Sequence, residues 1–312
     1  MNDEILSIED RDVISVLCGK KILITGAGGM LGTAFVNQIY KYIPDPRVLA
    51  LSRNQLDVCN DDHLEKIKAE NPDIIIHCAC LVNADMCEIQ PDVARNIIVS
   101  GTKNITKVAQ HCESQIIYPQ SFLIFSGDAP LVDEMTQPSP LNEYGRLKLE
   151  AEMEMLRQLP NSMSLRLGGF FGGGEKDKNF IGKFLALIKK AKQSNQNYLE
   201  IGNRVWQPTY TQDIAANSLL LLAKKKSGVY CMAAHGSATF YDVAKETINI
   251  LGLEDQITLG EIDASLFVMK EAAARPPAVI MQNKRLIKEN MDRQRVWSSA
   301  LKSYLSTYGF TL

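Results

Sequence analysis

Short apolar runs alternate with longer segments of helical hydrophobic periodicity through the first half of the chain. The apolar runs predict strands, and the periodic segments predict helices between them. The expected strands span Ile22–Ile24, Arg47–Ser52, Asp73–Cys78, Ser114–Tyr118 and Ser162–Leu167, and the expected helices span Asp61–Glu70, Pro91–Cys112 and Asn142–Leu156. Strands that alternate with helices are typical of parallel βαβ units. We therefore predict an α/β fold with a doubly wound parallel sheet, whose ligands bind at the carboxyl ends of the strands.

A glycine-rich stretch follows the first expected strand, and three of its glycines recur at three-residue spacing. A strand that turns sharply into a helix leaves backbone N–H groups pointing outward at the positive end of the helix dipole. Glycine permits the tight turn and lets a pyrophosphate approach the backbone. We predict that this turn binds a dinucleotide, and a plain strand–helix turn is the alternative. The residues expected to line the site are Gly26, Gly28, Gly29, Met30, Leu31 and Gly32.

The rhythm of the chain changes after about Gly168. We divide the sequence into a helical extension at residues 1–20, a dinucleotide-binding domain at residues 21–167, and a part at residues 168–312 that is mainly a smaller α/β cap. The cap is expected to shape a substrate cleft. Within it, a segment at about residues 205–232 is expected to return to the main sheet.

Composition and charge narrow the class of protein further. The 312 residues carry a formal net charge of −2, so we expect no bulk electrostatic attraction to nucleic acid or membranes. No apolar stretch approaches the roughly 18–20 residues that span a bilayer. The seven cysteines have no framework spacing and the acidic N-terminus lacks a secretory signal, which predicts a cytoplasmic protein with reduced thiols. His77 lies close to Cys78 and Cys80 in sequence, but cysteine near a buried strand behaves as a small hydrophobe, so we predict no metal site.

Three polar side chains form a candidate catalytic group. Tyr144 and Lys148 stand four residues apart in a helical segment and therefore share one helix face. A cation beside a phenol favours the phenolate, so we expect Lys148 to lower the pKa of Tyr144 toward neutral pH. Ser121 follows the fourth strand, where its hydroxyl can bind a substrate carbonyl oxygen and stabilise the charge that develops there. The alternatives are a solvated Tyr–Lys helix face and a serine that caps a turn.

The glycine turn, Ser121, Tyr144 and Lys148 together resemble the extended short-chain dehydrogenases/reductases, most closely the dTDP-4-dehydrorhamnose reductase family. The resemblance runs from about Lys21 to Leu305. Its motifs are the segments LDV (56–58), PDIIIHCACLVNADMCE (72–88), PLNEYGRLKLEAE (140–152) and QPTYTQDIA (207–215), and the pair Arg275-Pro276. The segment QPTYTQDIA is the most distinctive, because its wording is characteristic of the rhamnose-type reductases.

The resemblance implies a Rossmann-type fold and an enzyme that reduces the ketone of a nucleotide-activated 4-keto-6-deoxysugar. Hydride would come from a nicotinamide cofactor and a proton from Tyr144, while Lys148 would also hydrogen-bond the cofactor ribose. The nucleotide-sugar substrate would contact Ser121, Phe122, Trp206 and Arg275. Further cofactor contacts would come from Asp57, Val58, Cys78, Ala79 and Cys80. Many proteins of this class form homodimers, and the sequence leaves the oligomeric state open.

Three positions depart from the family pattern. Ile98 stands where the family usually has an asparagine that helps to organise a water linking the lysine to solvent, which puts proton resupply to Tyr144 in question. Phe122 replaces a polar residue after Ser121 and indicates a different substrate-facing surface. Trp206 stands where a small residue is common, and it either stacks on the substrate or packs in the cleft wall.

The end of the second strand bears on the choice of cofactor. An NAD-selective site places Asp or Glu there to bind the ribose 2′-hydroxyl, but this chain has Ser52 and Arg53. A guanidinium and a hydroxyl can hold a 2′-phosphate instead. We therefore predict NADPH in preference to NADH, and a solvent-exposed loop arginine is the alternative.

Two other functions stay open. An epimerase or dehydratase on the same fold usually has an acidic residue after the second strand or carboxylates beside the central hydroxyl, where this chain has Phe122. A regulatory dinucleotide-binding subunit, like the partner of methionine adenosyltransferase among the relatives of this family, would fit the replacement at Ile98.

For the reductase, the substrate diphosphate needs cations, and the candidates are Arg275, Arg204 and Lys178.

Overall fold

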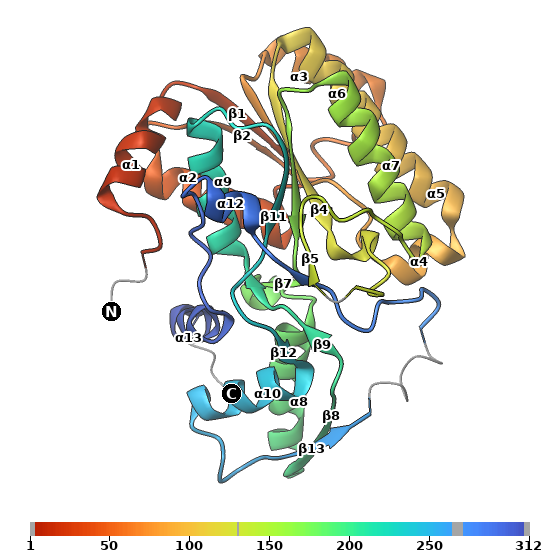
Figure 1. Ribbon diagram of the computed structural model, residues 1–312, viewed down its shortest axis with the longest axis vertical. Coiled ribbons are helices and arrows are strands. Elements are labelled where there is room, and N and C mark those ends of the chain that lie inside the picture. The colour runs from red at the N-terminus through yellow and green to blue at the C-terminus, as the bar shows by residue number, and fades with distance from the viewer. Residues whose placement is uncertain (1–3, 130, 264–270, 309–312) are drawn as a thin grey trace.

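Six parallel strands form the central sheet of the computed structural model, which describes residues 4–129, 131–263 and 271–308. Along the sheet the order is β11, β6, β4, β3, β1, β2 (Figure 1). The strands are β1 Lys21–Thr25, β2 Arg47–Leu51, β3 Ile74–His77, β4 Gln115–Ser121, β6 Met163–Leu167 and β11 Gly228–Met232. Every neighbouring pair runs parallel. The predicted α/β fold with a doubly wound parallel sheet is confirmed.

Helices cover both faces of this sheet because the strands send alternate side chains into two cores. Ile22 and Ile24 of β1 lie in one core, and Leu23 between them lies in the other. Figure 1 shows the two helical layers. The first core is closed by α2 (Met30–Tyr42), α9 (Thr211–Ala223) and α1 (Ile8–Ile14), and the second by α3 (Asp61–Glu70), α6 (Gly101–Cys112) and α7 (Glu143–Gln158).

The N-terminal extension contains α1 and a short 3₁₀ turn at Ser15–Leu17. A capping box between Ser7 and Asp10 starts α1. Asp10 also accepts two hydrogen bonds from the guanidinium of Arg293, at 2.7 and 2.9 Å. This ion pair ties the extension to the C-terminal part of the chain, while Ile14 is buried in the first core.

A π-helical turn interrupts the helix that the sequence predicts at Pro91–Cys112. The short helix α5 (Pro91–Arg95) leads into the turn Asn96–Ser100, and α6 continues from there. Ile98 lies in this turn and is buried. Single π-helical turns inside α-helices are frequent at functional sites. A further short helix that the sequence did not predict, α4 (Ala84–Ile89), precedes α5.

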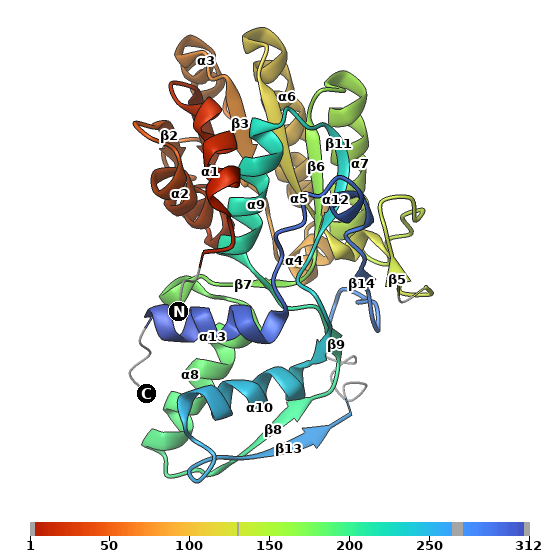
Figure 2. The same cartoon turned by 60° about the vertical axis from the view of Figure 1, so that its left-hand side comes forward.

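The second part of the chain forms a smaller α/β cap below the sheet (Figure 2). In this part β8 pairs with β13 in parallel, and β9 pairs with β12 in the antiparallel direction. The cap elements share a core of aromatic and aliphatic side chains that is distinct from the two cores of the sheet. The cap elements are α8 Phe180–Gln193, α10 Phe240–Leu251, α13 Trp297–Tyr308, β8 Tyr198–Gly202, β9 Val205–Trp206, β12 Ala238–Thr239 and β13 Thr258–Ile262.

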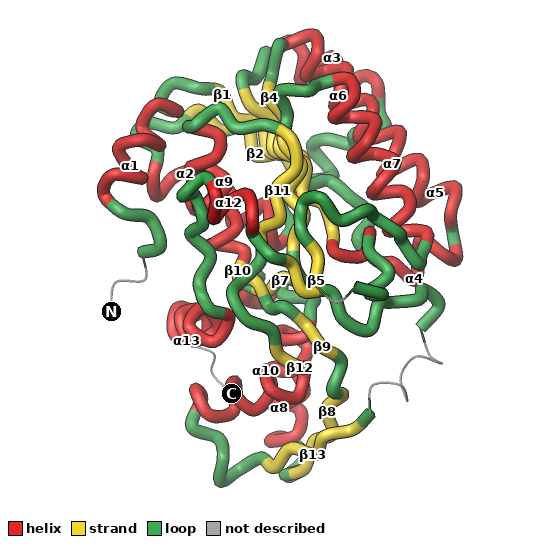
Figure 3. The backbone as a smooth tube through the Cα atoms, viewed as in Figure 1, coloured by secondary structure: helices red, strands yellow, loops and turns green. Residues whose placement is uncertain are grey.

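Short strands also pair outside the main sheet, and Figure 3 shows β7 (Phe170–Phe171) and β10 (Thr209–Tyr210) where the chain passes between the sheet and the cap. β7 pairs with β10, and β5 (Leu131–Val132) pairs with β14 (Ile280–Met281), which leads into α12 (Lys284–Lys288). β11 belongs to the main sheet, while β9 belongs to the cap, so both lobes contain parts of the segment 205–232. The predicted domain boundaries at residues 20 and 167 stay a prediction. Within the described ranges, no helix is long and apolar enough to cross a membrane.

Candidate active site

The glycine turn between β1 and α2 has the geometry of a phosphate site. Gly26 has a φ of +64°, and a Cβ there would lie 2.8 Å from the backbone nitrogen of Ala79. A Cβ on Gly32 would lie 2.5 Å from the carbonyl oxygen of Gly26, so the turn and the helix require glycine at both places. Gly29 caps α2 without any side-chain hydrogen bond, and Gly28 and Gly29 are exposed. The turn therefore fits a pyrophosphate, because its helix N-terminus is open to an anion.

The end of β2 lies beside this turn. A Cβ on Gly28 would be 3.8 Å from the Cβ of Ser52. Both the backbone N–H and the hydroxyl of Ser52 donate to the side-chain oxygen of Gln55, at 3.0 and 2.8 Å. Arg53 is exposed. Ser52 and Arg53, which are predicted to select NADPH, thus follow β2 directly. Their role in cofactor selection stays a prediction.

Two further predicted cofactor residues belong to the turn after β2. Asp57 is exposed, and its carboxylate accepts a hydrogen bond from the backbone N–H of Cys59 at 2.9 Å. Val58 is buried, and a Cβ on Gly101 of α6 would lie 2.6 Å from its side chain. The close approach of α6 therefore orders this turn.

Cys78, Ala79 and Cys80 follow β3 at the carboxyl edge of the sheet and are partly buried. The backbone N–H of Ala79 donates to the hydroxyl of Thr25 at 3.1 Å. Burial raises the pKa of the Cys78 thiol to about 12 and also raises the pKa of Cys80, so both thiols stay neutral. In the part of the chain that the structure describes, no group of three or more His, Cys, Asp and Glu side chains is placed to hold a metal ion.

Ser121, Tyr144 and Lys148 come together at the carboxyl end of β4. Ser121 is the last residue of that strand, and its hydroxyl lies near the phenol of Tyr144 at the start of α7, where it acts to lower the pKa of that phenol. Tyr144 is 8% exposed and Lys148 only 3%, which excludes a solvated helix face for the pair. The Ser121 hydroxyl also accepts the backbone N–H of Leu123 at 3.2 Å, so this serine caps the 3₁₀ turn Phe122–Ile124 as well.

Two local features position α7 against β4. Asn142 caps the helix, since its side-chain oxygen accepts the N–H of Gly145 at 2.8 Å. A Cβ on Gly145 would overlap the carbonyl oxygen of Leu123. Glycine at this position therefore lets the helix carry Tyr144 close to Ser121.

The environment of Lys148 differs from the expectation. Its ammonium donates to the carbonyl oxygen of Pro119 at 2.6 Å and lies 3.7 Å from the centre of the Tyr118 ring. Burial lowers the pKa of Lys148 and raises the pKa of Tyr144 well above its usual value. The prediction that Lys148 lowers the pKa of Tyr144 is therefore wrong for this structure, because desolvation of the buried phenol raises that pKa and the lowering contribution comes from Ser121 instead of Lys148.

A buried histidine, which the sequence analysis considered only as a metal ligand, lies next to this group. His77 ends β3, and its Nδ1 lies 2.8 Å from the hydroxyl of Thr25, while its Nε2 lies 3.2 Å from the hydroxyl of Thr102. Thr102 in turn donates to the carbonyl oxygen of Ile98 in the π-helical turn at 2.6 Å. Burial, with a contribution from Lys148, lowers the pKa of His77 to about 3, so the imidazole is neutral. In the sequence, His77 stands out as a polar residue at the end of an apolar strand. Its hydrogen-bond partners Thr25 and Thr102 lie far from it along the chain, so the sequence does not reveal them.

The predicted substrate residues have different surroundings. Phe122 is half-buried directly after Ser121. Trp206 is 8% exposed, and its ring makes edge contacts with Phe180 and Phe240 at centroid distances of 6.0 and 5.5 Å. A Cβ on Gly169 would overlap the Trp206 indole. This packing favours the alternative in which Trp206 belongs to the wall of the cleft.

The predicted diphosphate cations Arg275 and Arg204 both have carboxylate partners, neither of which the sequence analysis identified. Arg275 pairs with Asp85 of α4 and with Glu271, and Arg204 pairs with the same Glu271. Lys178 is exposed in the cap.

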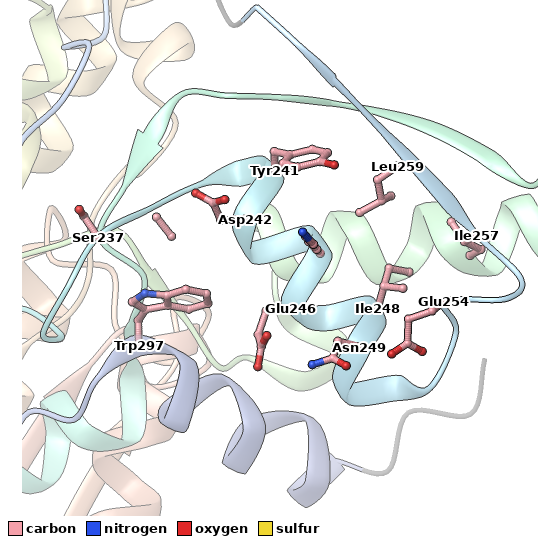
Figure 4. A pocket seen from close by; sticks show the side chains of 12 residues that line it. Ser237, Tyr241, Asp242, Glu246, Ile248, Asn249, Glu254, Ile257, Leu259 and Trp297 are labelled. Atoms are coloured by element: carbon pink, nitrogen blue, oxygen red, sulfur yellow. The ribbon is translucent and has the colours of Figure 1, made fainter.

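A separate cavity of about 570 Å³ lies in the cap between α10, the segment 257–259 and Trp297 (Figure 4). Three carboxylates and two large aromatic rings are among its lining side chains: Asp242, Glu246, Glu254, Tyr241 and Trp297. None of the predicted site residues is among the described residues that line it. The cavity is therefore distinct from the group at the end of β4.

The parallel sheet with its glycine turn, together with the Ser121, Tyr144 and Lys148 group, defines a protein of the short-chain dehydrogenase/reductase type. The model of the RmlD substrate binding domain family matches residues 20–310, and the chain belongs to this family. The predicted family resemblance is thereby confirmed. The match begins close to the start of β1 and so leaves α1 outside it.

Curated relatives of two kinds are similar to the chain. A dTDP-4-dehydrorhamnose reductase of Mycolicibacterium smegmatis is 26% identical over 289 residues, which cover 91% of this chain and 84% of the relative. The methionine adenosyltransferase 2 subunit beta of Xenopus tropicalis is 30% identical over 243 residues, which cover 72% of this chain and 70% of the relative.

Solved structures share the fold over nearly the whole chain. A dTDP-4-dehydrorhamnose reductase of Clostridium acetobutylicum is 27% identical with a TM-score of 0.85, covering 93% of this chain and 100% of that one. A dTDP-4-dehydrorhamnose reductase of Bacillus anthracis in complex with NADP has a TM-score of 0.83 at 23% identity, covering 92% and 99% of the two chains.

Proposed function

We propose that this protein reduces the ketone of a nucleotide-activated 4-keto-6-deoxysugar with NADPH. The observation that carries the proposal is the placement of the Ser121 and Tyr144 hydroxyls near each other at the carboxyl end of β4, with the buried Lys148 one helical turn further along α7. Similarity at 26 and 27% identity to dTDP-4-dehydrorhamnose reductases supports the substrate class.

The glycine turn and the end of β2 are the proposed cofactor site. Backbone N–H groups at Gly28 and Met30 would hold the pyrophosphate, while the N–H of Gly29 donates to the carbonyl oxygen of Gly26 and fixes the turn. Ser52 with Arg53 would hold the 2′-phosphate. When bound, NADPH supplies the hydride. The NADP complex of the Bacillus anthracis reductase, which has the same fold, supports this choice of cofactor.

The chain's own residues supply the proton and stabilise charge. The hydroxyls of Ser121 and Tyr144 donate to the ketone oxygen, where negative charge develops as the carbonyl carbon accepts hydride. The phenolic proton of Tyr144 then passes to that oxygen, which yields the alcohol and a phenolate. The raised pKa of Tyr144 keeps this proton in place at neutral pH, and an alkoxide is basic enough to remove it.

Loss of NADPH absorbance with dTDP-4-dehydrorhamnose as the probe substrate tests the proposal. Tyr144→Phe removes the proton donor and should lower kcat by about 100-fold or more. The matched control is Tyr40→Phe, because Tyr40 is 61% exposed on α2 and should keep wild-type activity. Full activity in Tyr144→Phe would refute the assignment of the proton donor.

A second candidate function is that of a regulatory subunit that binds a dinucleotide without turnover. The 30% identity to a methionine adenosyltransferase 2 subunit beta and the isoleucine at position 98 favour it. It predicts co-purification with a methionine adenosyltransferase catalytic subunit, together with tight NADPH binding and no oxidation of NADPH by any 4-keto-6-deoxysugar nucleotide. Turnover on one such sugar would decide for the reductase.

We also propose a cytoplasmic location for this reaction. All seven cysteines are free in the structure, which suits a reducing compartment. Fusion of the chain to a fluorescent protein in its native cell would test the location.

A further inference from the structure

A loop of the cap lies against the glycine turn of the candidate cofactor site. The loop 172–177 follows β7, and a Cβ on Gly173 would lie 2.7 Å from the side chain of Met30. Met30 is the first residue of α2, directly after the capping residue Gly29. Figure 2 shows the segment after β7 between α2 and α13. The loop therefore packs on the side chain of a residue whose backbone N–H would hold the cofactor pyrophosphate.

The loop 172–177 depends on glycine for its shape. Gly172 and Gly174 have φ values of +122° and +58°, in the region that residues with a side chain rarely adopt. A Cβ on Gly173 would also lie 2.8 Å from the backbone nitrogen of Asp177, so the loop is folded closely on itself. Glycine loses more conformational freedom on folding than any other residue, so a loop built on three glycines needs contacts from elsewhere to stay ordered.

A buried carboxylate and a buried phenol supply these contacts. Asp177 is 7% exposed, and its carboxylate accepts the backbone N–H groups of Gly172 and Asn179 at 3.0 and 2.9 Å. Tyr304 of α13 is fully buried. Its hydroxyl accepts the backbone N–H of Gly174 at 3.0 Å and donates to the Asp177 carboxylate at 3.3 Å. The start, the middle and the end of the loop are thus joined through two side chains.

Tyr304 also connects the loop to the core of the cap. Its ring lies 5.4 Å from the ring of Phe171 and 5.7 Å from that of Tyr210, measured between centroids. All three side chains belong to the cap core. Removal of the hydroxyl alone would leave this ring packing in place and take away the partner of the Gly174 N–H. The hydroxyl can therefore be tested separately from the ring.

We propose that Tyr304 is a positioning residue for the cofactor, whose hydroxyl, together with Asp177, holds the loop 172–177 against Met30 and so orders the pyrophosphate site. This inference rests on the proposed function, because it takes the glycine turn to be the NADPH site. A loop that is ordered before the cofactor arrives costs no ordering entropy on binding, whereas a loosened loop has to be ordered at the expense of affinity. The hydroxyl therefore strengthens NADPH binding and leaves hydride and proton transfer in the bound complex unchanged.

Fluorescence titration of the protein with NADPH measures this role without any need for turnover. Tyr304→Phe should weaken NADPH binding by about fivefold to tenfold, the size expected when one or two hydrogen bonds that order the loop are lost. With dTDP-4-dehydrorhamnose as the substrate, the KM for NADPH should rise by the same factor while kcat at saturating NADPH stays unchanged. Gly173→Ala should also weaken NADPH binding, because its Cβ pushes the loop away from Met30.

The matched control is Tyr230→Phe. Tyr230 is also fully buried, and its hydroxyl donates to the carboxylate of Glu289 at 3.0 Å. It belongs to β11, at the edge of the sheet opposite to β2. Thermal melting should show a similar loss of stability in the two tyrosine variants, but only Tyr304→Phe should bind NADPH more weakly. Should Tyr304→Phe not fold, Gly173→Ala makes the same test from the loop itself.

NADPH binding in Tyr304→Phe that equals that of the wild type, or that is weakened no more than in Tyr230→Phe, would overturn the proposal. A lower kcat at an unchanged KM for NADPH would also overturn it, because the hydroxyl would then act on the chemical step. A wild type that binds no NADPH would overturn the proposed cofactor site and this inference together. The expected binding pattern without turnover on any 4-keto-6-deoxysugar nucleotide would support the role of Tyr304 and count against the reductase.

Discussion

Mild acid should destabilise the protein through His77. The imidazole is fully buried between the hydroxyls of Thr25 and Thr102, at 2.8 and 3.2 Å from its two nitrogens. Burial, with the ammonium of Lys148 nearby, lowers the pKa of His77 to about 3 in the folded protein. In the unfolded chain a histidine has a pKa of about 6.5.

The sign and size of the effect follow from this difference in pKa. Between about pH 6.5 and pH 3 the unfolded chain binds a proton at His77 that the folded protein does not bind. The contribution to stability is therefore complete above the unfolded pKa and is lost as the pH falls below it. Each pH unit well below 6.5 removes about 1.4 kcal/mol, so the loss between pH 7 and pH 5 is about 2 kcal/mol.

Urea unfolding at pH 7, 6 and 5, followed by circular dichroism, measures this loss. We expect His77→Asn to be less stable than the wild type at every pH, but to lack the loss of about 2 kcal/mol between pH 7 and pH 5. The control His111→Asn removes an exposed histidine and should keep the pH dependence of the wild type. If wild type and His77→Asn lose the same free energy of unfolding over this range, the reasoning about a neutral buried imidazole is refuted.

Three further predictions concern the cofactor site and the N-terminal extension. A Cβ on Gly28 meets no described atom closer than 3.8 Å, so Gly28→Ala should weaken NADPH binding at an unchanged melting temperature. A Cβ on Gly32 would lie 2.5 Å from a carbonyl oxygen, so Gly32→Ala should lower the melting temperature. Equal melting temperatures of the two variants would contradict this difference. Arg53→Asp should raise the KM for NADPH by about tenfold or more and lower that for NADH, and an unchanged ratio of the two KM values would exclude Arg53 from 2′-phosphate binding. Asp10→Asn breaks the bidentate pair with Arg293 and should lower the free energy of unfolding by about 1–3 kcal/mol in urea titrations; no change would show that this pair does not stabilise the extension.

Much of the sheet domain could be predicted because its signals are local. The apolar run before the glycine turn and the helical pattern after it lie within a few residues, and β1 and α2 are found there. The predicted strand Arg47–Ser52 differs from β2 by one residue. Tyr144 and Lys148 share a face of α7 because a spacing of four residues is one helical turn. Each of these features depends on neighbours in sequence, and a pattern of polarity is enough to reveal them.

Features that depend on distant contacts could not be predicted. The pKa of Tyr144 depends on its burial among residues of α7 and the segment after β3, and sequence spacing carries no measure of burial. The sequence left open whether Trp206 stacks on a ligand or packs in the cleft wall, and the packing against it comes from Phe180 of α8 and Phe240 of α10. Glu271 stands 67 residues from Arg204, and a lone carboxylate at that separation gives no signal.

Transfer of deuterium from the cofactor to the sugar tests the central claim most directly. The wild-type protein would be incubated with NADPH that carries deuterium at the transferable position of the nicotinamide and with dTDP-4-dehydrorhamnose, and the product analysed by mass spectrometry and NMR. We expect one deuterium on the carbon of the former ketone, with a strong reduction of product in Tyr144→Phe and wild-type yield in Tyr40→Phe. A product without deuterium at that carbon, or no product while NADPH binds tightly, would contradict the reductase.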